Sequence, residues 1–133
     1  MSLSATDAQN KVQSLSTEYQ QLEVELSNAV EARQKLDAQL KENELVKKEF
    51  QVLKPENIVY KLIGPVLMKQ DQAEAKSNVE TRLEFIRGEI KRVEAQIEDL
   101  TAKSDKKKNE IVSIQTAFQQ QQEQQQQKTA VKA

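Results

Sequence analysis

Apolar residues recur at alternating intervals of three and four through the first third of the chain. This spacing places them along one side of a helix and is typical of the seam of a coiled coil. The seam positions are Val12, Leu15, Tyr19, Leu22, Leu26, Ala29, Arg33, Leu36 and Leu40. Arg33 is expected to cover the seam with its stem while its charge stays in water. We therefore predict a helix over about residues 8–53.

Beyond Leu40 the strict spacing would place Asn43 and Lys47 inside the seam. The apolar residues of this stretch are instead Leu45, Val46, Phe50 and Leu53. We therefore expect the seam to shift here. Pro55 is expected to end the helix, because its ring cannot continue the hydrogen-bond ladder and it disfavours helical angles in the residue before it.

A second helix is predicted over residues 72–123. Asp71 is suited to cap its first turn, and Glu74 follows three residues later, as in a capping box. The seam positions are Val79, Leu83, Ile86, Ile90, Val93, Ile97, Leu100, Ile111, Ile114 and Phe118. Ser104 and Lys107 occupy the two seam positions between Leu100 and Ile111, so a polar break is expected there.

The two predicted helices are long enough to pair along their whole length. Each would measure roughly 65–80 Å at 1.5 Å per residue. A short connector makes them antiparallel, and a turn centred near residue 62 brings both stripes together. The expected neighbours are Val12 with Ile114, Leu26 with Leu100, and Leu40 with Ile86. The fold class expected is therefore dominated by α-helix, as a long antiparallel coiled-coil hairpin.

The connector NIVYKLIGPVLMKQ, residues 57–70, is predicted to be a β-hairpin. Residues 58–63 and 66–69 are β-branched, aromatic or otherwise apolar, and Gly64 and Pro65 mark the bend. Alternation places apolar side chains on both faces. A lone two-stranded hairpin is marginally stable and its edges invite pairing. Either it folds down as a local cap on the helices, or it joins hairpins of other chains in a shared sheet or barrel.

The composition favours an extended architecture over a globular core. Only 37% of the 133 residues are hydrophobic and 4% aromatic, against 31% charged. The end of the chain, QQQQEQQQQKTAVKA, lacks an apolar stripe, so we expect residues 124–133 to be disordered. An aggregation role for this Gln-rich tract is the alternative.

Charge and residue content exclude several functional classes. Twenty basic and twenty-one acidic residues give a net charge of −1, so no specific nucleic acid and no membrane is expected as a partner. The cluster of Lys103, Lys106, Lys107 and Lys108 is read as a solvated helix face, with a polyanion contact as the alternative. The absence of His and Cys, with only two Gly, argues against an enzyme, a metal site or a cofactor site. The N-terminus shows no secretory signal and no segment is long and apolar enough for a membrane span, so a soluble intracellular protein is expected.

Three segments resemble the β-class subunits of the prefoldin family, in the same order. They are RQKLDAQLKENELVKKEF (33–50), VYKLIGPVLMKQD (59–71) and EAKSNVETRLEFIRGEIKRVEAQIEDL (74–100). The resemblance covers about residues 12–118, and VYKLIGPVL is its most specific part. It implies a hetero-hexamer of this chain with two α-class and three further β-class subunits, whose hairpins form an oligomeric β-barrel. It further implies an ATP-independent chaperone in the cytoplasm that captures unfolded actin and tubulin and delivers them to the cytosolic chaperonin.

The resemblance supports one set of candidate residues, and the seam pattern itself indicates a second. Candidates for assembly are Ile58, Val59, Tyr60, Leu62, Ile63, Val66 and Leu67. The polar break at Ser104 and Lys107 is expected to leave the helix ends loosely held and able to bind unfolded chains through apolar side chains. Candidates for client binding are Leu3, Val12, Leu15, Ile111, Ile114 and Phe118, although all except Leu3 could simply complete the seam. A plain coiled-coil tether or scaffold without chaperone activity is the alternative function.

Overall fold

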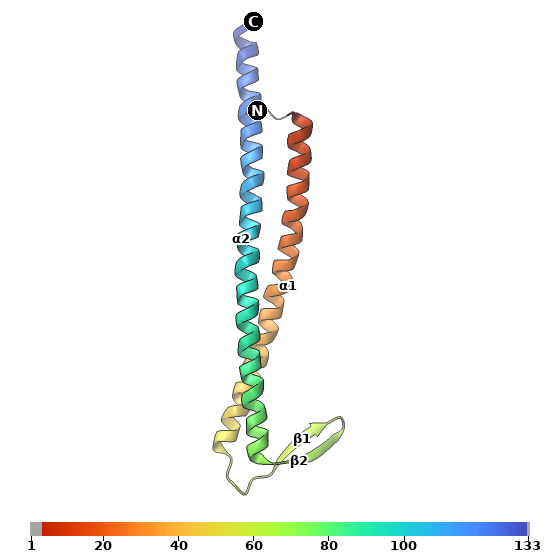
Figure 1. Cartoon of the computed structure of the whole chain (residues 1–133), viewed down its shortest axis with the longest axis vertical. Helices are drawn as coiled ribbons and strands as arrows, with labels where there is room; N and C mark the ends of the chain where they lie inside the picture. The colour runs from red at the N-terminus through yellow and green to blue at the C-terminus, as the bar shows by residue number, and fades with distance from the viewer. Residues whose placement is uncertain (1–3, 133) are drawn as a thin grey trace. The chain divides into compact units, whose positions relative to one another are not determined.

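The computed structural model describes residues 4–132, in which two long helices flank a β-hairpin. In chain order these are α1 (Ala5–Val52), β1 (Val59–Ile63), β2 (Val66–Gln70) and α2 (Gln72–Lys132) (Figure 1). The chain divides into two compact units. One, the helix-pair unit, combines Met1–Ala29 with Gln96–Ala133, of which 4–29 and 96–132 are described; the other, the hairpin unit, is Val30–Ala95.

Both helices begin at a side-chain cap. The Ser4 hydroxyl accepts a hydrogen bond from the Asp7 N–H at 3.1 Å, so α1 begins three residues earlier than the sequence pattern indicated. The Asp71 carboxylate accepts one from the Glu74 N–H at 3.1 Å, which confirms the predicted cap of α2. At its other end α1 stops at Val52, ahead of Pro55 as expected.

The predicted seams are confirmed along both helices. All nine positions from Val12 to Leu40 on α1 are buried or half-buried, and so are the ten apolar positions from Val79 to Phe118 on α2. Leu83 is fully buried in the hairpin unit. The other buried hydrophobic residues of α2 are Ala75, Ile86, Ile90, Val93 and Leu100.

The expected shift of the α1 seam after Leu40 is wrong. Leu45 and Val46 are exposed, whereas Asn43 and Lys47 keep the strict spacing and are half-buried. The seam tolerates them because both polar groups have partners. Asn43 Nδ2 donates to the Gln39 carbonyl oxygen at 2.7 Å, and Lys47 Nζ lies 3.1 Å from a carboxylate oxygen of Glu80 on α2.

Cross-helix pairs show that α1 and α2 run antiparallel at the predicted register. In the hairpin unit Arg33 Nη2 lies 3.0 Å from Glu94 Oε1, so the arginine keeps its charge at the seam edge as expected. In the helix-pair unit Lys107 Nζ lies 2.7 Å from Glu18 Oε2. Val12 and Ile114, predicted to be neighbours, line the same hollow between the helices.

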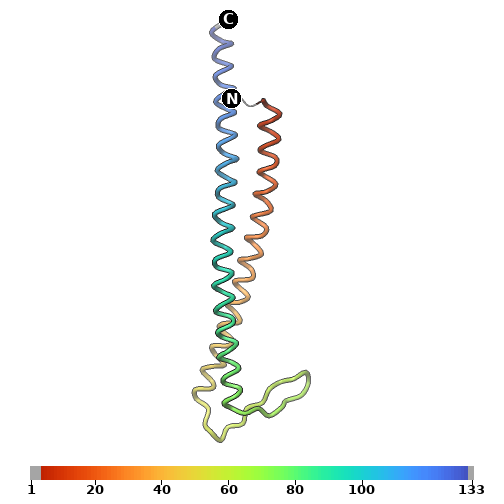
Figure 2. The backbone as a smooth tube through the Cα atoms, in the orientation of Figure 1, coloured from red at the N-terminus to blue at the C-terminus, as the bar shows by residue number. Residues whose placement is uncertain are grey.

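The β-hairpin closes through a two-residue turn. Ile63 pairs with Val66 across Gly64 and Pro65, and Val59 pairs with Gln70 at the base, so Ile58 lies just outside the strand predicted to contain it. Gly64 adopts a φ of 57°, a left-handed conformation that favours glycine. Figure 2 shows the chain leaving α1, forming this hairpin and returning as α2.

The expectation of a disordered tail over residues 124–133 is not met over its described part, because α2 continues through the Gln-rich tract to Lys132. Gln, Lys and Ala lose little on entering a helix, and the tract contains neither Gly nor Pro. An existing helix also extends more easily than a new one begins. Helix propensity therefore continues α2 where the seam has ended.

Removing the cap of α2 should destabilise the fold. For Asp71→Ala we expect the free energy of unfolding to fall by about 1 kcal/mol, because the Glu74 N–H loses its acceptor. Urea unfolding followed by circular dichroism measures this. Ser77→Ala, on the exposed surface of α2, is the control and should change stability by less than about 0.5 kcal/mol. Equal stabilities of the two variants would contradict the capping role.

Candidate assembly and client-binding surfaces

The β-hairpin exposes nearly all of its apolar side chains. Six of the seven residues predicted to serve assembly are exposed, with Leu62 at 68%, while Val59 is half-buried where the hairpin meets the helices. Met68 is a further exposed apolar residue that the sequence analysis did not nominate. It lies directly opposite Lys61 in the register, and the alternation of the second strand could have identified it. The hairpin is therefore a concentrated apolar surface.

The exposure extends to both faces and both edges of the sheet. Tyr60, Leu62 and Leu67 lie on one face, and Ile63 and Val66 on the other. The two strands pair only with each other among the described residues, so each outer edge leaves backbone groups without a strand partner. A local cap would bury these side chains against the helices, and the hairpin unit does not do so. The arrangement is suited to pairing with other chains.

Hydrogen bonds fix the base of the hairpin to both helices. The Lys54 N–H donates to Asn57 Oδ1 at 2.7 Å, and the Asn57 N–H donates back to the Lys54 oxygen at 3.0 Å. From the first turn of α2, Gln72 Nε2 donates to the backbone oxygens of Lys54 and Asn57 at 3.1 and 3.4 Å. The strands thus leave the helices from a defined turn, which orients the apolar surface.

In the helix-pair unit the polar break in the seam is filled by cross-helix partners. The hydroxyl of Ser104, which is buried, donates to the carboxylate of Glu23. Lys107 forms its ion pair with Glu18, and the hydrogen bond of that pair raises the pKa of Lys107. Such a pair adds stability that is present below the ordinary lysine pKa and is lost as the pH rises through the raised one. The two helices therefore remain paired across the break.

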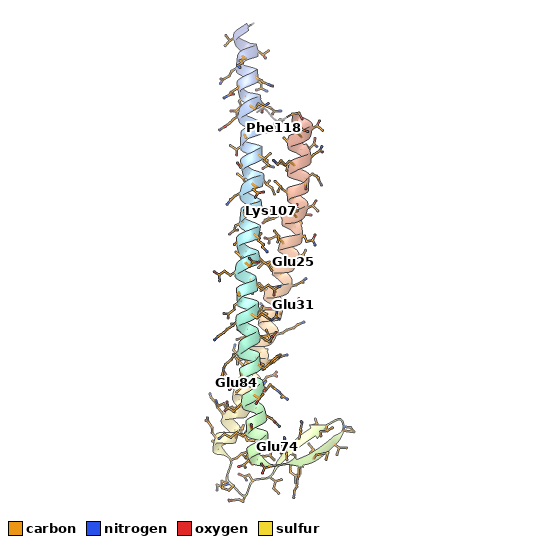
Figure 3. The ribbon with its side chains drawn as sticks, viewed as in Figure 1. Glu25, Glu31, Glu74, Glu84, Lys107 and Phe118 are labelled. Atoms are coloured by element: carbon orange, nitrogen blue, oxygen red, sulfur yellow. The ribbon has the colours of Figure 1, made fainter. Side chains whose placement is uncertain are left out.

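The described candidates for client binding lie together on the side of this polar layer toward the helix ends, and most are partly accessible. Leu15 is buried, whereas Val12, Ile111, Ile114 and Phe118 are half-buried. Leu3 lies outside the described residues. Val12, Ile114 and Phe118 line one hollow between the helices, whose remaining walls are mainly Ala and Gln side chains. Figure 3 shows Phe118 on α2 beside the start of α1.

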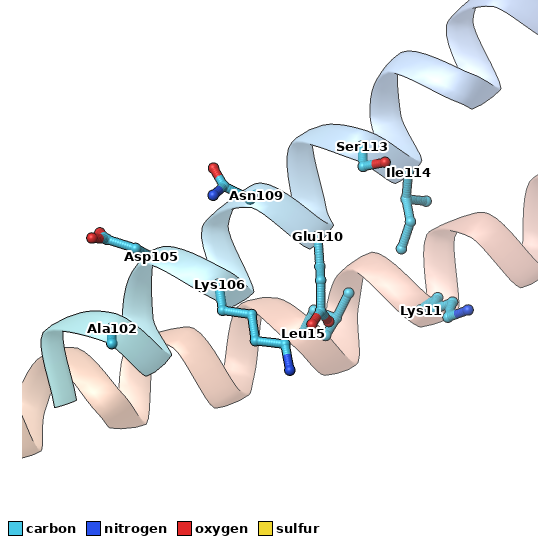
Figure 4. A pocket seen from close by; sticks show the side chains of 9 residues that line it. All are labelled: Lys11, Leu15, Ala102, Asp105, Lys106, Asn109, Glu110, Ser113 and Ile114. Carbon is cyan, nitrogen blue, oxygen red and sulfur yellow. The ribbon is translucent and has the colours of Figure 1, made fainter. Parts of the chain in front are cut away.

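A second hollow lies next to the polar layer, between Leu15 on α1 and the α2 segment from Ala102 to Ile114. Figure 4 shows Ile114 and Glu110 directed toward α1, and Asp105 and Asn109 directed away from it. Leu15, Ala102 and Ile114 supply apolar side chains to this hollow, and the other lining residues are polar or charged. The paired seam thus leaves apolar groups at the bottom of shallow grooves instead of on an open face.

The lysine cluster is partly neutralised by neighbouring carboxylates. Lys103 Nζ lies 2.9 Å from Asp99 Oδ2, and Lys107 is paired with Glu18. Asp105 lies within the cluster and Glu110 follows it in the next turn of α2. This arrangement favours the solvated-face interpretation over a contact with a polyanion.

The described part of the chain offers neither a metal-binding cluster nor a membrane-spanning helix. Within residues 4–132 no group of three or more His, Cys, Asp or Glu side chains is placed to hold a metal ion. No helix in that range has the length and apolar character needed to cross a membrane.

Comparison with known proteins identifies relatives over most of the chain. Residues 13–121 match the family model described as prefoldin subunit. Prefoldin subunit 6 of Mus musculus is 45% identical over 112 residues, which cover 84% of this chain and 88% of the mouse protein. Prefoldin subunit 6 of Saccharomyces cerevisiae is 45% identical over 100 residues, covering 75% and 88%.

A solved structure shares the fold. The crystal structure of the prefoldin beta subunit from Thermococcus strain KS-1 superimposes with a TM-score of 0.70 at 22% identity, covering 80% of this chain and 91% of that one. The fold class predicted from the heptads and the central hairpin is therefore confirmed. The resemblance to the prefoldin family is confirmed by the family model and the relatives.

Replacing the charged residue of the polar layer should not weaken the helix pair. For Lys107→Met we expect an equal or higher urea midpoint, because an apolar side chain at a seam position gains burial while Glu18 remains largely in water. Lys106→Met, next to it on α2 and without a described ion pair, is the control and should leave the midpoint unchanged. A clearly lower midpoint for Lys107→Met alone would contradict this expectation and would show that the ion pair contributes more stability than the apolar burial that replaces it.

Proposed function

The chain belongs to the prefoldin subunit family, and from this premise we propose that it is one of six subunits of a hetero-hexameric chaperone. Two α-class and three further β-class subunits complete the assembly. One hairpin per chain supports the β-class assignment, because α-class members of the family carry two. The hairpin of this chain contributes two strands to a β-barrel shared among the subunits.

The observation that carries this proposal is the exposed hairpin. Several large apolar side chains together in water, on a sheet with two open edges, are costly in an isolated chain. Strands from neighbouring subunits would pair with the edges and bury both faces. This need for partners explains why the connector between two helices has strand-forming residues instead of a short polar turn.

Capture of unfolded chains falls to the helix-pair unit. Val12, Leu15, Ile111, Ile114 and Phe118, with Leu3 as a further candidate, would contact apolar segments of a client when the helix ends separate. Each contact gains about 25 cal/mol per Å² of apolar surface before ordering costs. Several such tips on one assembly add by effective concentration, so weak individual contacts are sufficient.

Actin and tubulin are the proposed clients, and the cytosolic chaperonin is the proposed acceptor. Both proposals rest on the family resemblance. The work is proposed to take place in the cytoplasm and without catalysis. A chain without His or Cys has no imidazole base and no thiolate nucleophile, and with two Gly it offers no phosphate-binding loop. Holding and release would then depend on reversible apolar contacts and not on ATP hydrolysis by this subunit.

The tether alternative is less well supported. A plain coiled-coil scaffold would need the two seams but would have no use for a hairpin that exposes Tyr60, Leu62 and Leu67. It would also form a defined oligomer by itself. The family match across residues 13–121 further favours the assembly subunit.

A charge on the hairpin should prevent assembly. For Leu62→Asp we expect no incorporation into a complex with an α-class subunit and the remaining β-class subunits, because the carboxylate would be buried without a partner. Light scattering after size exclusion gives the mass of the mixture, and circular dichroism should show unchanged helix content.

Leu45→Asp is the matched control for this experiment. Leu45 is 62% exposed, close to the 68% of Leu62, but it lies on α1 and does not line the hollow beside the hairpin. We expect this variant to incorporate normally at one copy per particle. Equal incorporation of both variants would contradict the assembly role of the hairpin.

Polar substitutions in the helix-pair unit should weaken client binding without affecting assembly. For the triple variant Ile111→Ser, Ile114→Ser and Phe118→Ser we expect at least a several-fold loss in the suppression of actin aggregation by the complete assembly. Three apolar side chains are removed from each contact with an unfolded chain.

Val112→Ser is the control for the triple variant. It replaces an apolar residue with Ser in the same part of α2, but at an exposed position. Val112 is 52% exposed and lies off the seam, so the substitution should leave suppression of aggregation unchanged. Full activity of the triple variant within an intact complex would remove these residues from the client-binding surface.

A further inference from the structure

A hollow in the hairpin unit lies between the β-hairpin and the paired helices. Val46 and Phe50 of α1, Val79 of α2 and Val59 of β1 contribute apolar side chains to it. Val46 is exposed and the other three are half-buried. The hollow is therefore a groove with an apolar floor that begins where the hairpin leaves the helices.

The charges around this groove are unbalanced. Lys61 of β1 and Arg82 of α2 both line it, and no Asp or Glu is among the described residues that do. Elsewhere in this unit the cations at the helix interface are paired with carboxylates, as Arg33 is with Glu94 and Lys47 with Glu80. Neither Lys61 nor Arg82 has an ion-pair partner among the described residues. An occupant that supplies a carboxylate would complement both cations.

An exposed aromatic residue continues the groove along α2. Phe85 follows Arg82 by three residues and Asn78, another lining residue, by seven, so helical periodicity places all three on one face. The Phe85 side chain is 67% exposed. Large aromatic residues and Arg are the residue types that most often dominate binding energy at interfaces. Arg82 thus lies between apolar groups on a surface continuous with the hairpin.

We propose that this groove, from Val46 and Val59 past Arg82 to Phe85, binds a neighbouring subunit of the same assembly through a segment that carries a carboxylate among apolar side chains. The inference rests on the proposed function and extends the interface from the hairpin onto the base of the helices. Strand pairing alone would permit neighbours with any side chains. A charged and apolar groove beside the hairpin adds selectivity for one partner, because a segment lacking the carboxylate would leave two cations without a counter-charge.

Charge reversal on this face tests the proposal. The full-length chain, as wild type, Arg82→Glu or Lys91→Glu, is titrated into the α-class and remaining β-class subunits at several salt concentrations. Lys91 lies on α2 outside the groove and has no described ion-pair partner, so its reversal makes the same change in net charge. We expect Arg82→Glu to weaken incorporation at least about tenfold at low salt and Lys91→Glu less than about twofold. Arg82→Lys should restore most of the affinity.

The apolar part of the groove is tested by Phe85→Ser, with Leu45→Ser as its control on α1. We expect the first to weaken incorporation severalfold and the second to have no effect, with helix content unchanged in both. Equal incorporation of Arg82→Glu and Lys91→Glu, or incorporation of Phe85→Ser equal to that of Leu45→Ser, would overturn the proposal. Failure of the wild-type chain to enter the complex would instead overturn the proposed function.

Discussion

Burial of one narrow apolar stripe between two antiparallel helices is the interaction on which the structure depends. Leu83, Ile86, Ile90 and Val93 are nearly or completely removed from water, while most side chains on the outer faces of both helices are polar. Such a seam stabilises the pair in proportion to its length, because each heptad contributes a similar apolar area. The stability of the helix pair therefore requires long helices.

A seam of this kind accepts polar residues when each finds a partner. Asn43 bonds to its own helix, Lys47 reaches Glu80, Ser104 bonds to Glu23, and Lys107 pairs with Glu18. These groups contribute less burial than Leu or Ile, yet they leave no unsatisfied buried polar side-chain atom among the described residues. Polar layers of this type also favour one register over others, which matters where two long stripes could slide by a heptad.

The hairpin differs from the helices in that packing within the chain does not bury its apolar side chains. Its side chains gain little from the helices, and the surface that it presents becomes favourable only when other chains cover it. Stability within the chain and the proposed capacity to assemble thus reside in different elements. The groove beside the hairpin joins them, because Val46 and Phe50 come from the helix pair while Val59 and Lys61 come from the strand. A neighbour bound there would contact both elements.

Local patterns in the sequence were sufficient for the helices, the strands, the turn at Gly64 and the cap at Asp71, because spacing and residue type act over a few residues. They also sufficed to nominate the hairpin as an interface, since its apolar alternation has no use in a simple connector.

The local patterns failed after Leu40, where the apolar residues appeared to move the seam. Only the packing of α1 against α2 decided that Lys47 lies inside and Leu45 outside, because an ion pair to Glu80 depends on a residue 33 positions away. The expectation of a disordered tail was wrong because the absence of an apolar stripe indicates only that no partner helix packs there. It does not indicate that α2 ends. The unpaired charges of Lys61 and Arg82 became visible only in three dimensions, where residues from both helices and a strand meet.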